Sequence, residues 1–100
     1  MRTMLNITIP VETGNRAIKD NVLPKVMGGF SEEHHPESAY FYADGEGRRH
    51  AQFVFDLKDP SQIPAIAEPF FMQLNAAIEF HPVMNAEDLQ KGLQIAAKKF

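Results

Sequence analysis

Residues 38–56, SAYFYADGEGRRHAQFVFD, contain two runs of alternating apolar and polar residues on either side of a turn. Alternation with period two is typical of a strand that has one buried face. The turn DGEG at residues 44–47 is rich in residues that reverse the chain. The faces expected to be buried carry Ala39, Phe41 and Ala43 in the first run, and Ala51, Phe53 and Phe55 in the second. This stretch predicts an antiparallel hairpin of strands 38–43 and 48–56.

Two more alternating runs flank the hairpin, at residues 4–9 and 76–83. Pro10 ends the first run and Pro82 closes the second, and proline cannot donate to a sheet ladder. The apolar faces are Leu5, Ile7 and Ile9 in the first run, and Ala76, Ile78 and Phe80 in the second. We expect both runs to be strands, which brings the number of predicted strands to four.

Apolar residues recur at helical spacing between the first strand and the hairpin, at Ile18, Val22 and Val26. Thr13 or Asn15 is the expected N-cap, and Pro24 is expected to kink or restart the helix. The glycine pair at 28–29 predicts the C-terminal end. The polar residues 31–37, SEEHHPE, predict a surface loop.

A second helix is predicted to begin at Asp59-Pro60-Ser61-Gln62, with proline at the first helical position and Gln62 three residues after the cap. Its apolar positions are Ile63, Ile66, Ala67, Phe70 and Leu74. Pro69 is expected to bend or divide it. A final helix over residues 86–100 follows the cap Asn85 and carries acids in its first turn.

The order of these elements is β-α-β-β-α-β plus a C-terminal helix. If the connections through the two helices are right-handed, both helices lie on the same face of an antiparallel sheet. This order predicts an α+β fold of the ferredoxin-like type. No linker or charge block divides the chain, so we expect a single domain over residues 1–100, in which residues 86–100 are the C-terminal helix. The apolar strand faces, including Ala39 and Phe41, are the expected core.

Composition excludes several functional classes. The 100 residues include no cysteine, which removes disulfides, thiolate chemistry and Fe–S clusters. The net charge of −3 and the two short basic clusters at 48–49 and 98–99 argue against a nucleic-acid partner. The sequence predicts neither a signal peptide nor a membrane span, and we expect a cytoplasmic, cofactor-free protein with no membrane partner.

The sheet face away from the helices is predicted to be too apolar and aromatic for a solvent face. It collects Met4, Asn6, Thr8, Tyr40, Tyr42, His50, Gln52, Val54, Ala77, Glu79 and His81. At roughly 25 cal/mol per Å², covering its apolar part contributes several kcal/mol, comparable with much of the net stability of a small domain. We therefore expect a homodimer in which a second sheet covers this face and closes a barrel. The alternative is an open sheet with scattered apolar residues.

The chain also resembles a known superfamily, the dimeric α+β barrels, over residues 2–84. Besides the element order, the resemblance rests on IPAIAEPFF at 63–71 and PVMNAEDL at 82–89, which are similar to the helix, last strand and tail of small members. The superfamily includes muconolactone isomerase-like and EthD-like proteins and cofactor-independent monooxygenases. The resemblance implies the fold and the dimer.

The cofactor-independent monooxygenases of that superfamily use an asparagine on the first strand, a tryptophan, and a histidine or tyrosine. Asn6 lies on the matching strand of this chain. The chain has no tryptophan, and His81 falls on the last strand instead of a helix. The catalytic set of those enzymes is therefore not reproduced.

The strongest candidate for acid–base chemistry is His81, because histidine is the side chain best suited to proton transfer near neutral pH and His81 shares a strand face with Glu79. A desolvated carboxylate beside it would raise the histidine pKa. The candidate ligand-binding residues are Asn6, Tyr40, Tyr42, His50 and Gln52. The alternative is that all of these are interface polar groups satisfied by hydrogen bonds.

Two other patterns are better explained without a ligand. Adjacent histidines in the segment 31–37 cannot both point inward, so a solvated loop is favoured over a zinc or nickel site, and no metal is expected. Residues 48–55, RRHAQFVF, follow an RNA-recognition strand only superficially, because His50 and Gln52 stand where the stacking rings belong.

Three functions are compatible with the sequence. The leading hypothesis is a homodimer that binds a small, largely apolar molecule in a cavity between sheet and helices. The second is a cofactor-independent isomerase or monooxygenase in which His81 moves a proton and Glu79 orients it. The third is a structural or interaction module without a ligand.

Overall fold

The computed structural model describes all of residues 1–100, which form four strands and four helices. The elements are β1 (Arg2–Ile9), α1 (Val11–Lys19), α2 (Val22–His34), β2 (Ser38–Ala43), β3 (Arg49–Asp56), α3 (Gln62–Leu74), β4 (Ala77–Pro82) and α4 (Ala86–Ala97). None of the helices is long and apolar enough to cross a membrane.

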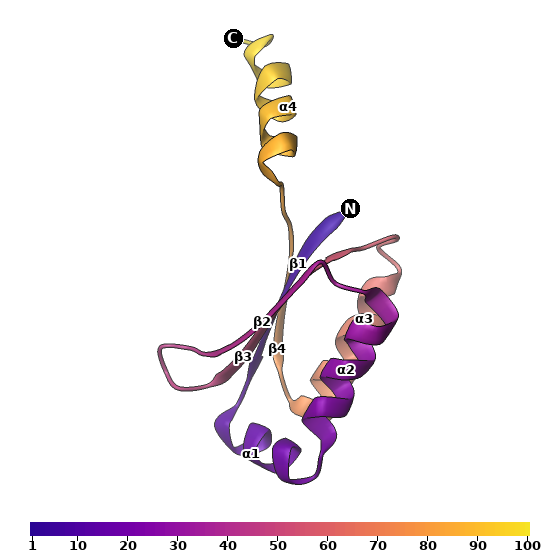
Figure 1. Ribbon diagram of the computed structural model, residues 1–100, viewed down its shortest axis with the longest axis vertical. Coiled ribbons are helices and arrows are strands. Elements are labelled where there is room, and N and C mark those ends of the chain that lie inside the picture. The colour runs from indigo at the N-terminus through magenta and orange to yellow at the C-terminus, as the bar shows by residue number, and fades with distance from the viewer.

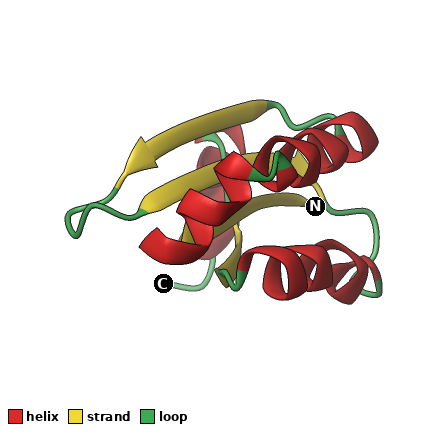
Figure 2. Ribbon diagram, turned by 90° about the horizontal axis from the view of Figure 1, so that it is seen from below, coloured by secondary structure: helices red, strands yellow, loops and turns green.

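The strands form one antiparallel sheet in the order β2-β3-β1-β4. They lie side by side as a single layer in Figure 2, and α2 and α3 run together along one side of it in Figure 1. This arrangement fits the predicted ferredoxin-like fold. The sheet is open, because β2 and β4 each have one neighbour and form its edges. One chain therefore forms no closed barrel.

The core lies between the sheet and the helices. Burial alternates strictly along β1, and β3 follows the same pattern from Ala51 to Phe55. The largest side chains below 2% exposure are Leu5, Ile7, Ile9, Phe53, Phe55, Phe70 and Leu74. Phe30 of α2 packs with its ring centroid 4.7 Å from Phe53 and 5.2 Å from Phe55, which fastens this helix over β3. The predicted inner faces of β1 and β3 are confirmed.

The first predicted helix differs from the observed one in its start, its continuity and its end. The observed helix begins at Val11 after Pro10, so neither Thr13 nor Asn15 is its N-cap. It is divided by Asn21, whose left-handed backbone (φ 58°) separates α1 from α2, and Pro24 falls in the first turn of the restarted helix. The glycines at 28–29 do not end α2, which continues to His34. Each glycine inside a helix destabilises it by about 1 kcal/mol. Burial of the Phe30 side chain, one residue after the glycine pair, stabilises the helix by more than this. The segment 31–34 is therefore helical and not loop.

The prediction that Ala39 and Phe41 belong to the core was wrong. Both are exposed, and Phe41 retains 62% of its accessible surface. The ring of Phe41 packs edge-on against the ring of Phe53. The two ring planes are nearly perpendicular, and their centroids are 5.8 Å apart. Both residues are exposed because no helix covers them. α2 packs over β3, and no helix extends over β2, the strand at the edge of the sheet. The inner face of β2 is left open.

The second predicted helix is confirmed with small changes. The side-chain oxygen of Gln62 accepts from the backbone N–H of Asp59, as the predicted cap requires, although α3 itself begins at Gln62. Pro69 lies inside α3 without dividing it, because Ile66 and Phe70 on either side are buried and hold the helix on the core. At the other end of the chain, Asn85 and Asp88 form the predicted cap of α4 as a reciprocal capping box.

Acid sensitivity follows from Asp56 at the end of β3. Hydrogen bonds from Lys58 and from the amino group of Met1, both at 2.7 Å, lower the pKa of Asp56 to about 2. A carboxylate with a lowered folded pKa stabilises the fold above its ordinary pKa and loses that contribution as pH falls towards the folded value. We expect Asp56→Asn to lower Tm at pH 6, and the difference from wild type to vanish by about pH 2.

Thermal unfolding followed by circular dichroism from pH 6 to pH 2 measures this effect. Glu68→Gln is the matched control, because Glu68 is exposed and makes no hydrogen bond or ion pair. A difference between Asp56→Asn and wild type that stays constant with pH would contradict the assignment.

Candidate functional site

The face of the sheet away from the helices carries all the predicted site residues. The register pairs Gln52 with both Tyr40 and Asn6, and pairs Asn6 with Glu79, so these four side chains form one row across the four strands. Parallel rows on either side are Tyr42, His50, Thr8 and Ala77, and Ser38, Val54, Met4 and His81. The structure therefore brings the predicted residues together on one face.

Several polar groups on this face already bond to one another. The Gln52 amide donates to the Asn6 side-chain oxygen at 3.2 Å. His50 Nδ1 lies 3.0 Å from the Thr8 hydroxyl, and its ring stacks on Tyr42 with centroids 4.6 Å apart. Mutually satisfied polar groups can be buried against a partner at low cost. Asn6, His50 and Gln52 therefore have hydrogen-bond partners within a single chain.

The predicted acid–base pair lies at one end of the face. His81 Nε2 is 3.3 Å from Glu79 Oε2, so the two side chains meet as their spacing along β4 predicts. Their side chains are 52% and 62% exposed, which places the pair in water in a single chain. Desolvation of this pair requires a second molecule over the face.

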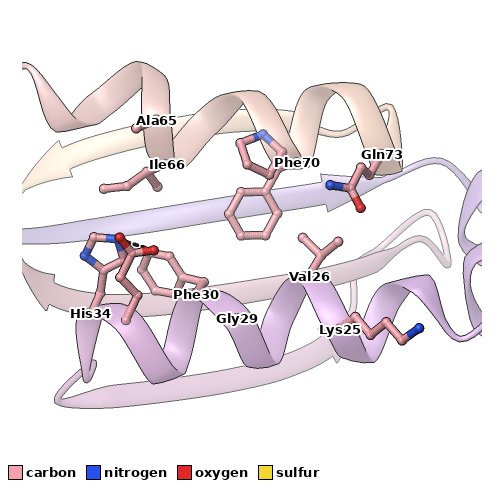
Figure 3. A pocket seen from close by; sticks show the side chains of 11 residues that line it. Lys25, Val26, Gly29, Phe30, His34, Ala65, Ile66, Phe70 and Gln73 are labelled. Carbon is pink, nitrogen blue, oxygen red and sulfur yellow. Dashed lines mark ion pairs between the residues drawn. The ribbon is translucent and has the colours of Figure 1, made fainter.

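A hollow that none of these residues line lies between α2 and α3 (Figure 3). Its volume is about 380 Å³, within the range of small-molecule sites. Its walls are Val26, Phe30, Ile66, Pro69 and Phe70, with Lys25 and Gln73 at one end and Glu33 and His34 at the other. Two of its lining residues are small, Gly29 of α2 and Ala65 of α3, and a Cβ added at Gly29 would meet no atom within 4 Å. We call it the α2–α3 groove.

His34 is the one polar side chain of the α2–α3 groove that is held mainly in apolar surroundings. Its side chain is only 12% exposed, and its ring packs against Phe30 at 4.9 Å and Phe55 at 5.6 Å. It makes no hydrogen bond, and its nearest charged neighbour is Glu33 at 3.9 Å. No polar side-chain atom is sealed from solvent without a partner, so the ring nitrogens of His34 keep access to solvent. His34 can therefore donate to or accept from a ligand.

The prediction from sequence missed His34 because it assigned residues 31–37 to a loop. The signal was present: Val26, Phe30 and His34 follow one another at intervals of four, which continues the buried stripe of the helix. His35 instead ends α2 in a left-handed conformation (φ 45°) and is exposed. The chain has no group of three or more His, Cys, Asp or Glu side chains that are close enough to hold a metal ion.

A smaller hollow of about 280 Å³ opens at the edge of the sheet, beside the uncovered inner face of β2. It lies between α2 and the sheet and is mostly apolar. Its lining residues include Ile9, Leu23, Met27, Phe41 and Ala51. We call it the β2 hollow.

Comparison with known proteins supports the fold and nothing narrower. A formyltetrahydrofolate deformylase from Pseudomonas putida KT2440 aligns with a TM-score of 0.55 at 16% sequence identity, over 83% of this chain. The alignment covers 29% of the deformylase chain, so the present chain spans under a third of that protein. No protein-family model matches the sequence, and no curated protein sequence does. The small α+β fold with a four-stranded antiparallel sheet is thus shared with a domain-sized part of a larger enzyme.

Proposed function

We propose that this protein is a homodimer that binds a small, largely apolar molecule. The dimer is supported by the uncovered sheet face, where Tyr40 and Tyr42 remain 66% and 46% exposed beside partly buried Met4 and Val54. An apolar and aromatic face of this kind is typical of an interaction site. A second sheet covers it with a surface of the same chemistry, as a two-fold axis requires.

The ligand site in this proposal is the α2–α3 groove. The observation that carries it is His34 at its end, a mostly buried imidazole that makes no hydrogen bond and has only the exposed carboxylate of Glu33 nearby, at 3.9 Å. Apolar walls with a few polar groups are typical of small-molecule sites. Lys25 at the opposite end adds a cation. The chemistry fits a compact apolar or aromatic body that carries an acidic or hydroxyl group, which the imidazole or the ammonium can hydrogen-bond.

Filling the groove tests this site. We expect Gly29→Leu to place a side chain in the open space between α2 and α3 and to abolish binding of the fluorescent probe 1-anilinonaphthalene-8-sulfonate, an aromatic anion. Gly28→Leu is the matched control: it is the same substitution one residue earlier in α2, also into open space, outside the groove. Fluorescence titration measures both variants. Equal probe binding by the two variants would contradict the groove as the site.

A thermal-shift screen of small aromatic acids, lactones, quinones and haem extends the test to candidate ligands. A binder present at 100 times its Kd adds roughly 2.7 kcal/mol of stability, which is easily measured in a small domain. We expect a hit to lose its shift in Gly29→Leu and to keep it in Gly28→Leu. No shift with any compound, together with no probe binding, would favour the structural module.

The second candidate function is a cofactor-independent isomerase or monooxygenase, favoured by the 3.3 Å contact between His81 and Glu79. In this reading a second chain desolvates the pair, His81 moves a proton, Glu79 orients it, and Asn6 or Tyr40 holds an oxyanion. His81→Ala would then remove turnover and leave dimerisation unchanged. Loss of the dimer in His81→Ala would instead mark His81 as an interface residue.

A further inference from the structure

The C-terminal helix α4 contributes nothing to the core of its own chain. It has no buried residue, and in Figure 1 it projects alone from the end of the molecule opposite to α1. A twelve-residue helix is marginal in water without tertiary contacts. The helix therefore gains stability from any surface that covers its apolar side.

The apolar residues of α4 repeat with the spacing of a two-stranded coiled coil. Leu89 and Leu93 are four residues apart and are 46% and 59% exposed. Alanines continue the pattern three residues before Leu89 and three residues after Leu93, at Ala86 and Ala96. Spacings of three, four and three residues correspond to positions a and d of a heptad. We call these four residues the α4 seam.

The rest of the α4 surface is compatible with a second helix against the seam. Glu87 and Lys91 form an ion pair of 3.4 Å on the side of the helix opposite to the seam. The helical positions that flank the seam are uncharged: they are Gln90, Gly92 and Ala97. No like charges therefore meet when two copies of this helix pair in parallel, and the small residues allow a close approach.

The open face of the sheet indicates how two chains are related in the proposed dimer. A two-fold axis parallel to the strands reverses the order β2-β3-β1-β4, so each row of side chains faces its own copy in reverse. In the middle row, Gln52 then faces the partner's Asn6, and Tyr40 faces the partner's Glu79. The bond within one chain uses the Gln52 amide and the Asn6 oxygen, which leaves the Gln52 oxygen and the Asn6 amide to pair across the interface.

The neighbouring rows are also complementary about this axis. Val54 faces the partner's Met4, which sets apolar against apolar, and Tyr42 faces the partner's Ala77, which sets large against small. Packed sheets align within about 30°, so this facing is closest for the central strands β1 and β3. A perpendicular axis over the middle row would instead set Glu79 against its own copy, a like-charge contact. Side-chain chemistry thus favours the axis parallel to the strands.

An axis parallel to the strands keeps both copies of α4 at the same end of the dimer. Pro82 pairs with Thr3, and the backbone N–H of Val83 donates to the Arg2 carbonyl at 3.1 Å, so each chain leaves the sheet where β1 begins. The two β4 strands are then roughly 14 Å apart across the sheets and about 10 Å apart between them. Both helices continue beyond this end, as α4 does in Figure 1.

A contact within each chain draws the start of α4 towards the axis. Arg2 Nη1 is 3.2 Å from Asp88 Oδ2 in the first turn of α4. Arg2 lies on β1, a central strand, and belongs to the half of its alternation that lies on the open face. The ion pair therefore ties α4 to the middle of the sheet, on the side that faces the second copy.

We propose that the two α4 helices of the dimer pack together as a parallel two-stranded coiled coil, with Leu89 and Leu93 in the seam. The inference rests on the sheet-to-sheet dimer proposed above and extends its interface beyond the sheets. The two-fold axis of the sheets continues between the helices, so each seam meets its own copy. Two helices this short pair because the sheets hold them at a high effective concentration.

Cross-linking at a single cysteine tests this arrangement, because the chain has no cysteine of its own. Leu93→Cys places one thiol from each chain in the seam, and we expect a short bismaleimide to convert most of the full-length protein into covalent dimer. Ala96→Cys, which keeps both leucines, is expected to behave in the same way. Ile95→Cys is the matched control, because Ile95 is 61% exposed on α4 but lies outside the seam, and we expect little covalent dimer. Denaturing gel electrophoresis over a dilution series measures the yields.

The outcomes separate this inference from the dimer itself. If wild type sediments as a dimer and neither seam variant forms covalent dimer, the helix pair is wrong and the sheet interface stands. A yield from Ile95→Cys equal to that from Leu93→Cys also overturns the pair, because it means that α4 has no defined seam. Wild type that sediments as a monomer at high concentration overturns both proposals.

Discussion

Val54→Glu is expected to convert the proposed homodimer into monomers. Val54 is partly buried at the outer face of β3, a central strand, and pairs with Met4 across the ladder. In one chain the new carboxylate points to solvent, so the fold tolerates it. In a sheet-to-sheet dimer it is buried without a partner, and the two-fold axis places two such charges in one interface.

An unpaired buried charge destabilises by about 3 kcal/mol or more, and two of them weaken association roughly 10⁴-fold. Sedimentation velocity over a concentration series measures this change. Val11→Glu is the matched control, since Val11 is 48% exposed at the start of α1 and away from the sheet face. If Val54→Glu remains dimeric, or if Val11→Glu becomes monomeric, the interface lies on another surface and the sheet-to-sheet proposal is wrong.

Phe70→Ala is expected to have the largest effect on stability. Phe70 is 1% exposed at the centre of α3, with its ring centroid 6.1 Å from that of Phe30. Removal of a buried phenylalanine costs about 3–5 kcal/mol through lost transfer energy and the cavity that remains. That is a large part of the roughly 5–15 kcal/mol that holds a small domain together.

Phe71→Ala removes the same side chain one residue later, from a position that is 43% exposed. Urea unfolding of both variants, analysed for midpoint and slope, compares them directly. We expect the loss in Phe71→Ala to be less than half of that in Phe70→Ala. Equal losses would mean that Phe71 packs against a second chain, and an unchanged midpoint in Phe70→Ala would contradict the core assignment.

Local sequence patterns predicted the strands well, because period-two alternation and burial on one face are consequences of the same geometry. The runs around Leu5, Ile7, Phe53 and Phe55 became β1 and β3 with the predicted faces inward. The capping residues Asn85 and Asp88 acted as predicted, because a cap involves only neighbours in the chain. The register likewise put Tyr40, Gln52 and Asn6 in one row.

The errors arose where burial depends on elements distant in the sequence. The glycine pair at 28–29 is a local stop signal, yet contacts of Phe30 with Phe53 and Phe55 carry α2 through it to His34. The same extension moved His34 out of a predicted loop and into the α2–α3 groove, where its ring is held by aromatic neighbours from two elements.

The sequence by itself determined the strands, the open-face row and the cap of α4, since each depends on periodicity or on neighbours along the chain. Only the tertiary structure decided that the inner face of β2 lies uncovered and that α4 has no surface within its own chain. Alternation marks Phe41 as apolar in the same way as Phe53, but it carries no information on how far a helix layer extends. Whether an apolar side chain becomes core depends on what stands above it, which sequence neighbours do not specify.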